Sequence, residues 1–360
     1  MSNKQYDALV YIGRFQPFHL GHKSIIDRAL ELADRVIIVI GSSNSSRSTR
    51  NPFTHQDRVA MIRACYPNHV NEIQFAHVQD YPYKDSKWIS TIQEKVRRRV
   101  GSKGSDAKIG LIGHNKDHSS FYLKMFPQWK SEPAPNYKGI DATTIRETLF
   151  RARNNGVIDG WSDDVPKEVV SWILFWIKEN PAIYKQIVDE YQFVSEYKQL
   201  WSAAPYPPIF STVDSIVCQS GHVLMIKRKF APGKGLWALP GGYVDPNETL
   251  LESAIRELRE ETKIKVPAPV LKGSVVSQHT FDDPHRSQRG RVISTGFYIE
   301  LPPAKTLPRV AGGDDAAKAK WIPLNDIHPA ACFEDHYSII DYFLDPSPFS
   351  TSRTAVEAFL

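Results

Sequence analysis

The sequence predicts two domains: an α/β domain with a doubly wound parallel sheet, followed by an α+β domain with a mixed sheet. Over about the first 150 residues, short apolar runs alternate with helical patterns, which is typical of parallel sheets. A proline-rich stretch, S-A-A-P-Y-P-P-I-F at residues 202–210, then breaks the helical pattern. Beyond it the pattern changes to hairpins, the first with strands at residues 211–218 and 223–228.

The composition argues against a membrane protein, a secreted protein and a nucleic-acid-binding protein. The chain is 41% hydrophobic, but no apolar run is long enough to span a bilayer, and its polar start is too short for a signal peptide. Its three cysteines, Cys65, Cys218 and Cys332, are far apart, which indicates a reducing compartment. The net charge of +5 suits anionic nucleotides but is too weak to indicate nucleic acid. We therefore expect a cytoplasmic protein that binds neither membranes nor nucleic acid.

The elements of the first domain follow from apolar periodicity. Buried strands are expected at residues 8–12, 35–40, 73–78 and 108–112. Helices are expected over residues 54–65, 85–100 and 165–197, and after residue 22, where Ile25, Ile26, Ala29, Leu30 and Ala33 share one face. Ligands of such sheets bind at the carboxyl ends of the strands, so the loops that follow them should carry the chemistry.

The first chemical motif is G-R-F-Q-P-F-H-L-G-H at residues 13–22, between an expected strand and helix. A helix entrance presents backbone N–H groups and a positive dipole end to an anion. His19 and His22 can donate hydrogen bonds to oxygens that gain charge as a phosphorus–oxygen bond breaks, and Arg14 adds a cation. Alone, H-x-G-H is equally consistent with a turn that exposes two histidines, but the flanking G-R-F-Q-P-F favours a functional site.

This motif resembles the signature of nucleotidyltransferases that transfer an adenylyl group from ATP to a phosphate. The resemblance implies ATP as a substrate, Mg²⁺ on its triphosphate, and catalytic roles for Arg14, His19 and His22. It also implies that Gly13 and Phe15 bind substrate. From the residues alone, the aromatic side chain of Phe15 is more typical of packing than of a ligand contact.

Residues 41–54, G-S-S-N-S-S-R-S-T-R-N-P-F-T, form a hydroxyl-rich loop after an expected strand. Such a loop is either flexible or able to bind phosphate oxygens. Its N-P-F-T ending resembles archaeal-type nicotinamide mononucleotide (NMN) adenylyltransferases, which implies that Arg47 and Asn51 bind substrate. Trp88 is compatible with a core position, but the resemblance implies that a nicotinamide ring stacks on it. A further loop, G-H-N-K-D-H-S-S-F-Y, places His114 at another strand end.

The third element is I-D-A-T-T-I-R-E at residues 140–147. Thr143 or Thr144 can cap a helix whose N-terminus faces phosphate, with Arg146 one turn in. It resembles the I-S-x-T-x-I-R element that closes the same active site in this superfamily. The resemblance implies a binding role for Thr144 and a catalytic role for Arg146, whereas Asp141 replaces the usual serine.

The second domain carries a cluster of carboxylates. Glu257, Glu260 and Glu261 are spaced i, i+3 and i+4, so they share one helix face. They repel one another unless they hold a hard cation such as Mg²⁺ or Mn²⁺, which can polarise a diphosphate and activate water. Arg256 is then expected to orient the carboxylates. A merely solvated acidic face would explain neither the spacing nor the L-P-G-G loop before it.

The spacing G-x5-E-x7-R-E-U-x-E-E, with U apolar, resembles the Nudix box. The resemblance implies that Glu260 and Glu261 are also catalytic. The final glycine of the box is Lys263 here, which we expect to be tolerated in a left-handed conformation. Residues 281–291 resemble the insert of Nudix enzymes that act on ADP-ribose. Its arginines suit a diphosphate or a terminal ribose phosphate, and they are Arg286, Arg289 and Arg291.

Taken together, the pieces resemble bifunctional NMN adenylyltransferase/Nudix hydrolases over nearly the whole chain. The expected domains are a nucleotidyltransferase at residues 1–201, a linker at 202–210, a Nudix domain at 211–345 and a tail at 346–360. The resemblance implies ATP, NMN and ADP-ribose as small-molecule partners, and a homo-oligomer is possible. Two alternatives stay open: another acceptor, namely pantetheine phosphate or flavin mononucleotide, and a Nudix domain that senses ADP-ribose without hydrolysing it.

Overall fold

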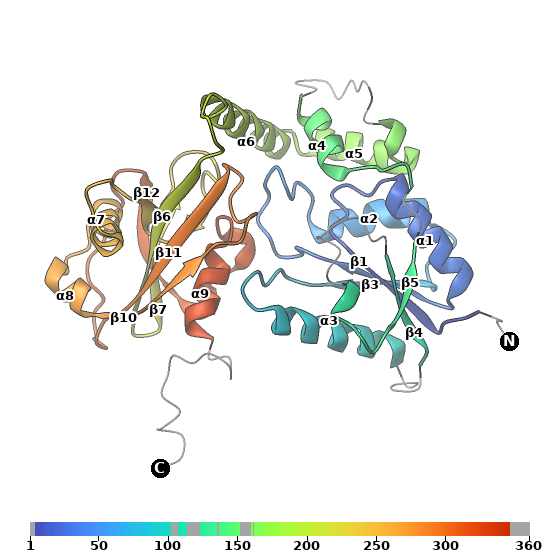
Figure 1. The fold of residues 1–360 in the computed structure, drawn as a ribbon, viewed down its shortest axis with the longest axis horizontal. Helices are drawn as coiled ribbons and strands as arrows, with labels where there is room; N and C mark the ends of the chain where they lie inside the picture. The colour runs from blue at the N-terminus through green and yellow to red at the C-terminus, as the bar shows by residue number, and fades with distance from the viewer. Residues whose placement is uncertain are drawn as a thin grey trace, which may run out of the picture. The chain divides into compact units, whose positions relative to one another are not determined.

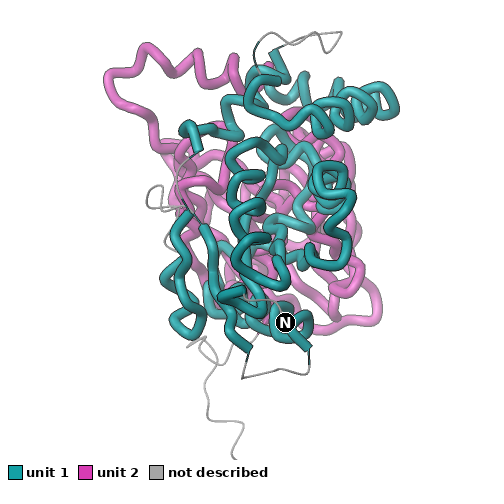
Figure 2. The backbone as a smooth tube through the Cα atoms, turned by 90° about the vertical axis from the view of Figure 1, so that its right-hand side faces the viewer, with its two compact units in different colours: residues 1–191 teal, residues 192–360 magenta. Residues whose placement is uncertain are grey.

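The computed structural model describes residues 4–101, 107–113, 123–134, 137–151, 160 and 162–345. It divides into two compact units, residues 1–191 and 192–360 (Figure 2). The division falls inside helix α6 (Pro181–Leu200), so the last turns of this helix belong to unit 2. The linker expected at residues 202–210 begins after α6, and its last two residues already belong to β6 (Ile209–Gln219), the first strand of unit 2.

Unit 1 contains a five-stranded sheet in which every pair is parallel, as predicted. The strand order is β3-β2-β1-β4-β5. The strands are β1 (Ala8–Gly13), β2 (Val36–Ile40), β3 (Ile73–His77), β4 (Ile109–Gly113) and β5 (Lys130–Pro133). The order reverses between β1 and β4, so the carboxyl end of β1 lies at the topological switch point, where open α/β sheets bind ligands.

Helices cover both faces of this sheet (Figure 1). They are α1 (Leu20–Leu32), α2 (His55–Cys65), α3 (Asp85–Val100), α4 (Ala142–Arg151) and α5 (Lys167–Glu179), joined by the first part of α6. Alternate residues of β1 point to opposite cores. Leu9 and Tyr11 pack with α1, α2, α4, α5 and α6, whereas Val10 and Ile12 pack with α3. This is the doubly wound arrangement that the sequence predicts.

One predicted helix is wrong in its extent. The helix expected over residues 165–197 is interrupted, since α5 ends at Glu179 and α6 begins at Pro181. Proline has no N–H to continue the hydrogen bonds of a preceding helix, but it is well accommodated in the first turn of a new one. The two tryptophan rings of α5 serve packing within unit 1, because the ring of Phe53 meets those of Trp172 and Trp176 edge to face, with centroids 6.1 and 5.2 Å apart.

Unit 2 contains a mixed sheet in the order β10-β11-β6-β7-β12, to which β8 and β9 are added beside β7 and β6. Its strands are β6 (Ile209–Gln219), β7 (His222–Arg228), β8 (Trp237–Ala238), β9 (Gly241–Tyr243), β10 (Val275–Phe281), β11 (Arg291–Glu300) and β12 (Ala316–Pro323). Only β6 and β11 pair in parallel. The predicted first hairpin is confirmed, since Ser220 and Gly221, both with positive φ, form its two-residue turn.

The helices of unit 2 are α7 (Leu250–Thr262), α8 (Ala268–Gly273) and α9 (His336–Leu344). Helices α7 and α9 flank the sheet on opposite sides (Figure 1). Alternate residues of β11 contact the two helices: Phe297 and Ile299 pack in the core beneath α7, whereas Tyr298 stacks on Phe343 of α9. Within the described ranges of both units, no helix is long and apolar enough to cross a membrane.

Candidate active sites

The H-x-G-H turn brings the two predicted catalytic histidines of unit 1 together at the start of α1. The Nδ1 atom of His19 accepts a hydrogen bond from the backbone N–H of His22 (3.4 Å), and Nδ1 of His22 accepts one from the backbone N–H of His19 (3.3 Å). The two rings stack with centroids 3.6 Å apart. Because each Nδ1 accepts, each neutral ring carries its proton on Nε2 and can donate there. Burial, and secondarily His19, lowers the pKa of His22 well below its usual value, which keeps it neutral.

Three guanidinium groups lie close together, two from loops (Arg14 and Arg50) and one from helix α4 (Arg146). Desolvation, followed by the like charges of Arg50 and Arg146, lowers the pKa of Arg14 to about 10, and Asp80 and Asp141 oppose this effect. Like charges gathered in a partly desolvated place repel one another until an anion joins them. This arrangement therefore suits a polyphosphate.

Arg146 is less free than its predicted role implies. It is buried, and it donates to the carbonyl oxygens of Gln16 (Nη1, 2.7 Å) and Thr49 (Nε, 3.1 Å) and to the hydroxyl of Thr143 (Nη2, 3.2 Å). These bonds use three of its five donor hydrogens. Arg146 thus ties α4 and the hydroxyl-rich loop to the turn that carries the histidines, and burial lowers its pKa to about 10.

The cap of α4 corrects the sequence prediction. The Oδ2 atom of Asp141 accepts hydrogen bonds from the backbone N–H groups of Thr143 (3.1 Å) and Thr144 (3.2 Å), so neither threonine is the capping residue. A carboxylate is a strong cap because its charge also interacts favourably with the positive end of the helix. Asp141, the residue that departs from the family pattern, is therefore the cap of α4.

The remaining predicted binding residues of unit 1 differ in how accessible they are. Phe15 is only 1% exposed and lies in the core, so the predicted substrate contact of its ring is not seen. A Cβ atom on Gly13 would lie 2.8 Å from the Phe15 ring, which explains the glycine. Arg47 forms an ion pair with Asp57 (3.0 Å) and lies over the ring of Trp176.

Two other predicted residues keep polar or aromatic surface for a ligand. The Oδ1 atom of Asn51 is buried without a hydrogen-bond partner in the described part of the chain. Trp88 is half-buried, and its ring packs against Phe126 with centroids 6.0 Å apart, which leaves part of the indole accessible. His114 and its neighbours in the G-H-N-K-D-H-S-S-F-Y loop lie outside the described residues.

Sequence reasoning missed Arg58, which is fully buried on α2. Its guanidinium donates to the carbonyl oxygens of Arg14 (2.7 Å), Gly41 (2.7 Å), Ser42 (3.2 Å) and Thr54 (3.1 Å). It therefore joins the chain segments that leave β1 and β2, and burial lowers its pKa to about 10. Its position in the sequence could have indicated this role, because Arg58 lies on the same face of α2 as the buried apolar residues Met61 and Ile62.

In unit 2, helix α7 begins and ends as its sequence directs. Thr249 is the N-cap, and a capping box with Glu252 satisfies two backbone N–H groups of the first turn. The helix ends at Lys263, which has φ 48° and ψ 29°. The prediction that this lysine adopts the left-handed conformation usually given to glycine is confirmed.

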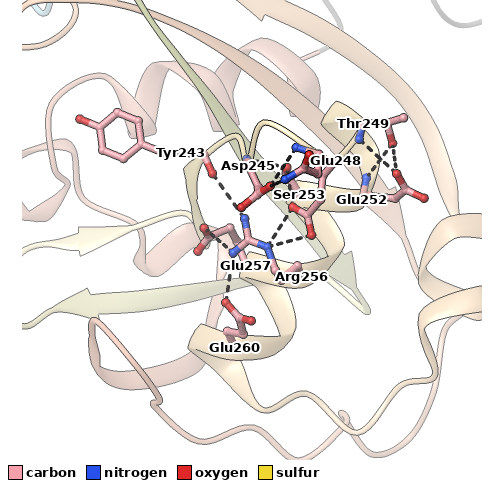
Figure 3. Close-up of polar contacts among 10 residues, drawn as sticks. Tyr243, Asp245, Glu248, Thr249, Glu252, Ser253, Arg256, Glu257 and Glu260 are labelled. Carbon is pink, nitrogen blue, oxygen red and sulfur yellow. Dashed lines mark hydrogen bonds and ion pairs between the residues drawn. The ribbon is translucent and has the colours of Figure 1, made fainter.

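Arg256 lies at the centre of the acidic residues of α7 (Figure 3). Its guanidinium forms ion pairs with Glu248 (2.9 Å), Glu257 (2.8 Å) and Glu260 (3.1 Å). Of the three carboxylates that it was expected to orient, it contacts Glu257 and Glu260. Its Nη2 also donates to the carbonyl oxygen of Tyr243 (3.4 Å), which connects α7 to strand β9.

The glycines of the L-P-G-G loop pack directly against the carboxylates. Glu261 is buried and accepts a hydrogen bond from the backbone N–H of Gly241 (3.0 Å), and a Cβ atom on Gly242 would lie 2.6 Å from the carboxylate of Glu257. Burial raises the pKa of Glu261 to about 8, and the charge of Glu257 adds to this shift. Burial also raises the pKa of Glu257.

These carboxylates fit a divalent cation by their chemistry. In the described residues no three acidic, histidine or cysteine side chains converge closely enough to bind a metal as they stand, and Arg256 pairs with both Glu257 and Glu260. However, Glu257 and Glu261 are carboxylates held in partly desolvated positions where their charges repel, and a hard cation would relieve that repulsion.

The three arginines of the insert do not converge on one place. Arg286 is buried in a two-pronged ion pair with Asp335 (2.9 and 3.0 Å), so it holds the insert in place. Arg291 donates to the carbonyl oxygen of Asp282. Arg289 is the best placed for a ligand: Nη1 lies 3.3 Å from the hydroxyl of Tyr243, and its buried Nε makes no hydrogen bond within the described ranges.

Two family models match the chain: the cytidylyltransferase-like family over residues 10–148 and the NUDIX domain over residues 209–343. The fold and the two sites thus define a nucleotidyltransferase joined to a Nudix domain. A bifunctional NMN adenylyltransferase/ADP ribose pyrophosphatase from Francisella tularensis has a similar structure, with a TM-score of 0.87 and 35% identity over 95% of this chain and 99% of that one. The chain belongs to this bifunctional family.

Relatives of the separate halves agree with this assignment. A nicotinamide/nicotinic acid mononucleotide adenylyltransferase of Acinetobacter baylyi is 34% identical over 52% of this chain and 95% of its own length. An ADP-ribose pyrophosphatase of Methanocaldococcus jannaschii is 36% identical over 36% of this chain and 70% of its own length. The Francisella structure has also been solved with AMP and a manganese ion, at 34% identity and a TM-score of 0.86.

Proposed function

We propose that unit 1 transfers the adenylyl group of ATP to NMN, giving NAD⁺ and diphosphate, and that unit 2 hydrolyses ADP-ribose to AMP and ribose 5-phosphate. The observation that carries the first half is the pair of stacked imidazoles, each with its Nδ1 bonded to a backbone N–H, in the same unit as three guanidinium groups that lie close together. Such a site can stabilise negative charge on a phosphate but offers no nucleophile of its own. We further propose that both reactions take place in the cytoplasm.

In unit 1 the phosphate of NMN attacks the α-phosphorus of ATP in line, and diphosphate leaves. The residues position the two phosphates and stabilise charge on the oxygens that gain it, which is the main contribution available to phosphoryl transfer. The Nε2–H groups of His19 and His22 are the donors, and Arg14 offsets the charge of the triphosphate together with Mg²⁺. Trp88 supplies the exposed part of its ring to the nicotinamide.

In unit 2 the substrate diphosphate binds beside α7. A divalent cation held by Glu257, Glu260 and Glu261 would polarise the diphosphate and activate a water molecule. Arg256 keeps Glu257 and Glu260 in place, and Gly241 and Gly242 allow the backbone of β9 to approach. Arg289, whose guanidinium lies over the Tyr243 ring of β9, supplies a further cation for the diphosphate.

Incubating the full chain with NMN, ATP and Mg²⁺, and separately with ADP-ribose and Mg²⁺ or Mn²⁺, tests both halves when the products are separated by chromatography. We expect NAD⁺ from the first mixture, and AMP with ribose 5-phosphate from the second. Pantetheine phosphate and flavin mononucleotide serve as alternative acceptors, and faster turnover of either would refute the assignment to NMN. Binding of ADP-ribose without cleavage would identify unit 2 as a sensor.

A further inference from the structure

Four aromatic rings adjoin one another in unit 2 beside the carboxylates of α7. Tyr197 and Trp201 come from the end of α6 and the turn after it, Phe210 from the start of β6, and Tyr243 from β9. The centroid of the Phe210 ring lies 5.1 Å from that of Trp201, 6.1 Å from that of Tyr197 and 5.8 Å from that of Tyr243. We call these four rings the aromatic cluster. Two of its rings remain open to solvent, since Trp201 is 43% and Tyr243 39% exposed.

Tyr243 connects this cluster to the carboxylates. Its backbone follows Gly242, which touches Glu257, and its carbonyl oxygen accepts from Arg256. Its ring points away from the carboxylates of α7 (Figure 3), and its hydroxyl lies 3.0 Å from the hydroxyl of Tyr197. The solvent-exposed Tyr243 is therefore the residue directly after Gly242, which packs against Glu257, one of the carboxylates expected to engage a diphosphate.

Arg289 adds a cation to the same place. Its guanidinium lies over the Tyr243 ring, 5.6 Å from the centroid, and its buried Nε makes no hydrogen bond in the described residues. Arg228 lies near enough to both Arg289 and Glu261 to be affected by their charges, so the cation is close to the acidic site. A ligand that reaches from the carboxylates to this cluster would meet first a cation and then an aromatic face.

We propose that Tyr243 and Trp201 form the subsite that recognises the planar base of a nucleoside diphosphate substrate, with Arg289 between the base and the diphosphate. Aromatic rings bind bases by stacking, and a neighbouring guanidinium strengthens this contact. The chain before the hydrolase sheet is then part of the substrate site rather than a linker. This inference rests on the proposed action of unit 2 on ADP-ribose.

The test compares two product inhibitors of ADP-ribose hydrolysis by the full chain. AMP carries the base, whereas ribose 5-phosphate does not. Replacing Tyr243→Ala should weaken inhibition by AMP about 5- to 150-fold, the range found when an aromatic side chain that stacks on a base is removed. Inhibition by ribose 5-phosphate should stay within about twofold. Trp201→Ala should act in the same direction, and Tyr243→Phe, which keeps the ring, should stay near the wild type.

Phe230→Ala is the matched control, because Phe230 is 53% exposed in unit 2 but lies outside the cluster. Equal weakening of both inhibitors in Tyr243→Ala would overturn the subsite, as would unchanged inhibition by AMP. Unchanged inhibition in Trp201→Ala would overturn the role of the segment before the sheet. If the wild type binds ADP-ribose without cleaving it, the proposed hydrolysis fails, and calorimetric affinities of the same variants for ADP-ribose still decide whether the base subsite exists.

Discussion

The two sites of this protein both suit phosphates, yet they gather opposite charges. Unit 1 brings Arg14, Arg50 and Arg146 close together, and Asp80 and Asp141 offset their like charges only in part, so the pKa of Arg14 is still lowered. Unit 2 brings Glu257 and Glu261 together in partly buried positions, where Arg256 pairs with Glu257 but burial still raises the pKa of both carboxylates. The comparison teaches that each site is electrostatically unfavourable alone and is completed by what it binds.

The largest effect should come from removing a carboxylate of α7. We expect Glu260→Gln or Glu261→Gln to abolish metal-dependent hydrolysis of ADP-ribose while NAD⁺ synthesis by the same chain continues. Both rates can be measured by chromatography on one preparation, so the synthesis reaction is the control for folding of unit 1. Hydrolysis that survives in both variants would reject the carboxylate site.

The raised pKa of Glu261 predicts that the stability of the metal-free protein depends on pH. The folded-state pKa of Glu261 is raised to about 8, so the folded protein binds this proton more tightly than the unfolded chain does. The stability that this tighter proton binding contributes is fully present below the ordinary carboxyl pKa, near 4.5. It is lost as the pH rises towards 8. In a chelator, Glu261→Gln should therefore raise the melting temperature relative to the wild type more at pH 8 than at pH 5. An equal difference at both pH values would contradict the raised pKa.

A histidine of unit 1 should have the next largest effect. Loss of one donor that stabilises transition-state charge typically lowers the rate about 10²- to 10³-fold. We expect His19→Ala or His22→Ala to lower kcat for NAD⁺ synthesis by this amount and to leave hydrolysis of ADP-ribose unchanged. Full synthesis in either variant would show that the acceptor phosphate reacts elsewhere.

Trp88 should affect one substrate of unit 1 more than the other. Trp88→Ala should raise the KM for NMN about 2- to 10-fold, the value of one aromatic contact, and change that for ATP less. Steady-state kinetics with each substrate varied in turn measure both constants, and Trp88→Phe provides the matched control. Equal changes in the two constants would mean that the ring serves only to pack against Phe126.

The smallest effect is expected at Lys263. Glycine would relieve about 1 kcal/mol of left-handed strain, but it would remove a cation from the helix end, and these contributions nearly cancel. Lys263→Gly should change the free energy of unfolding by less than about 1 kcal/mol and hydrolysis only a few-fold. Denaturant unfolding and an activity assay measure the two. Cleavage that appears only in the variant would show that the lysine makes unit 2 a sensor.

The sequence predicted the elements and motifs whose residues are close together in the chain. The H-x-G-H turn and the carboxylate spacing of α7 are local patterns, so helix geometry alone brings their side chains together. It did not predict which arginines are already engaged. Arg146 donates to Gln16, 130 positions away, and Arg286 pairs with Asp335, 49 positions away, and no local pattern encodes such partners.

Because the division between the two units lies inside α6, it affects where the chain could be split into two separate proteins. Two functions joined by a loop can be exchanged between genes by recombination within that loop. Here a break in the proline-rich stretch would leave Tyr197 and Trp201 with the first half, although their rings pack with Phe210 of the second. A break before them would cut a helix. Neither junction keeps both the helix and the aromatic contacts intact, so splitting the chain at either place should destabilise one of the two units.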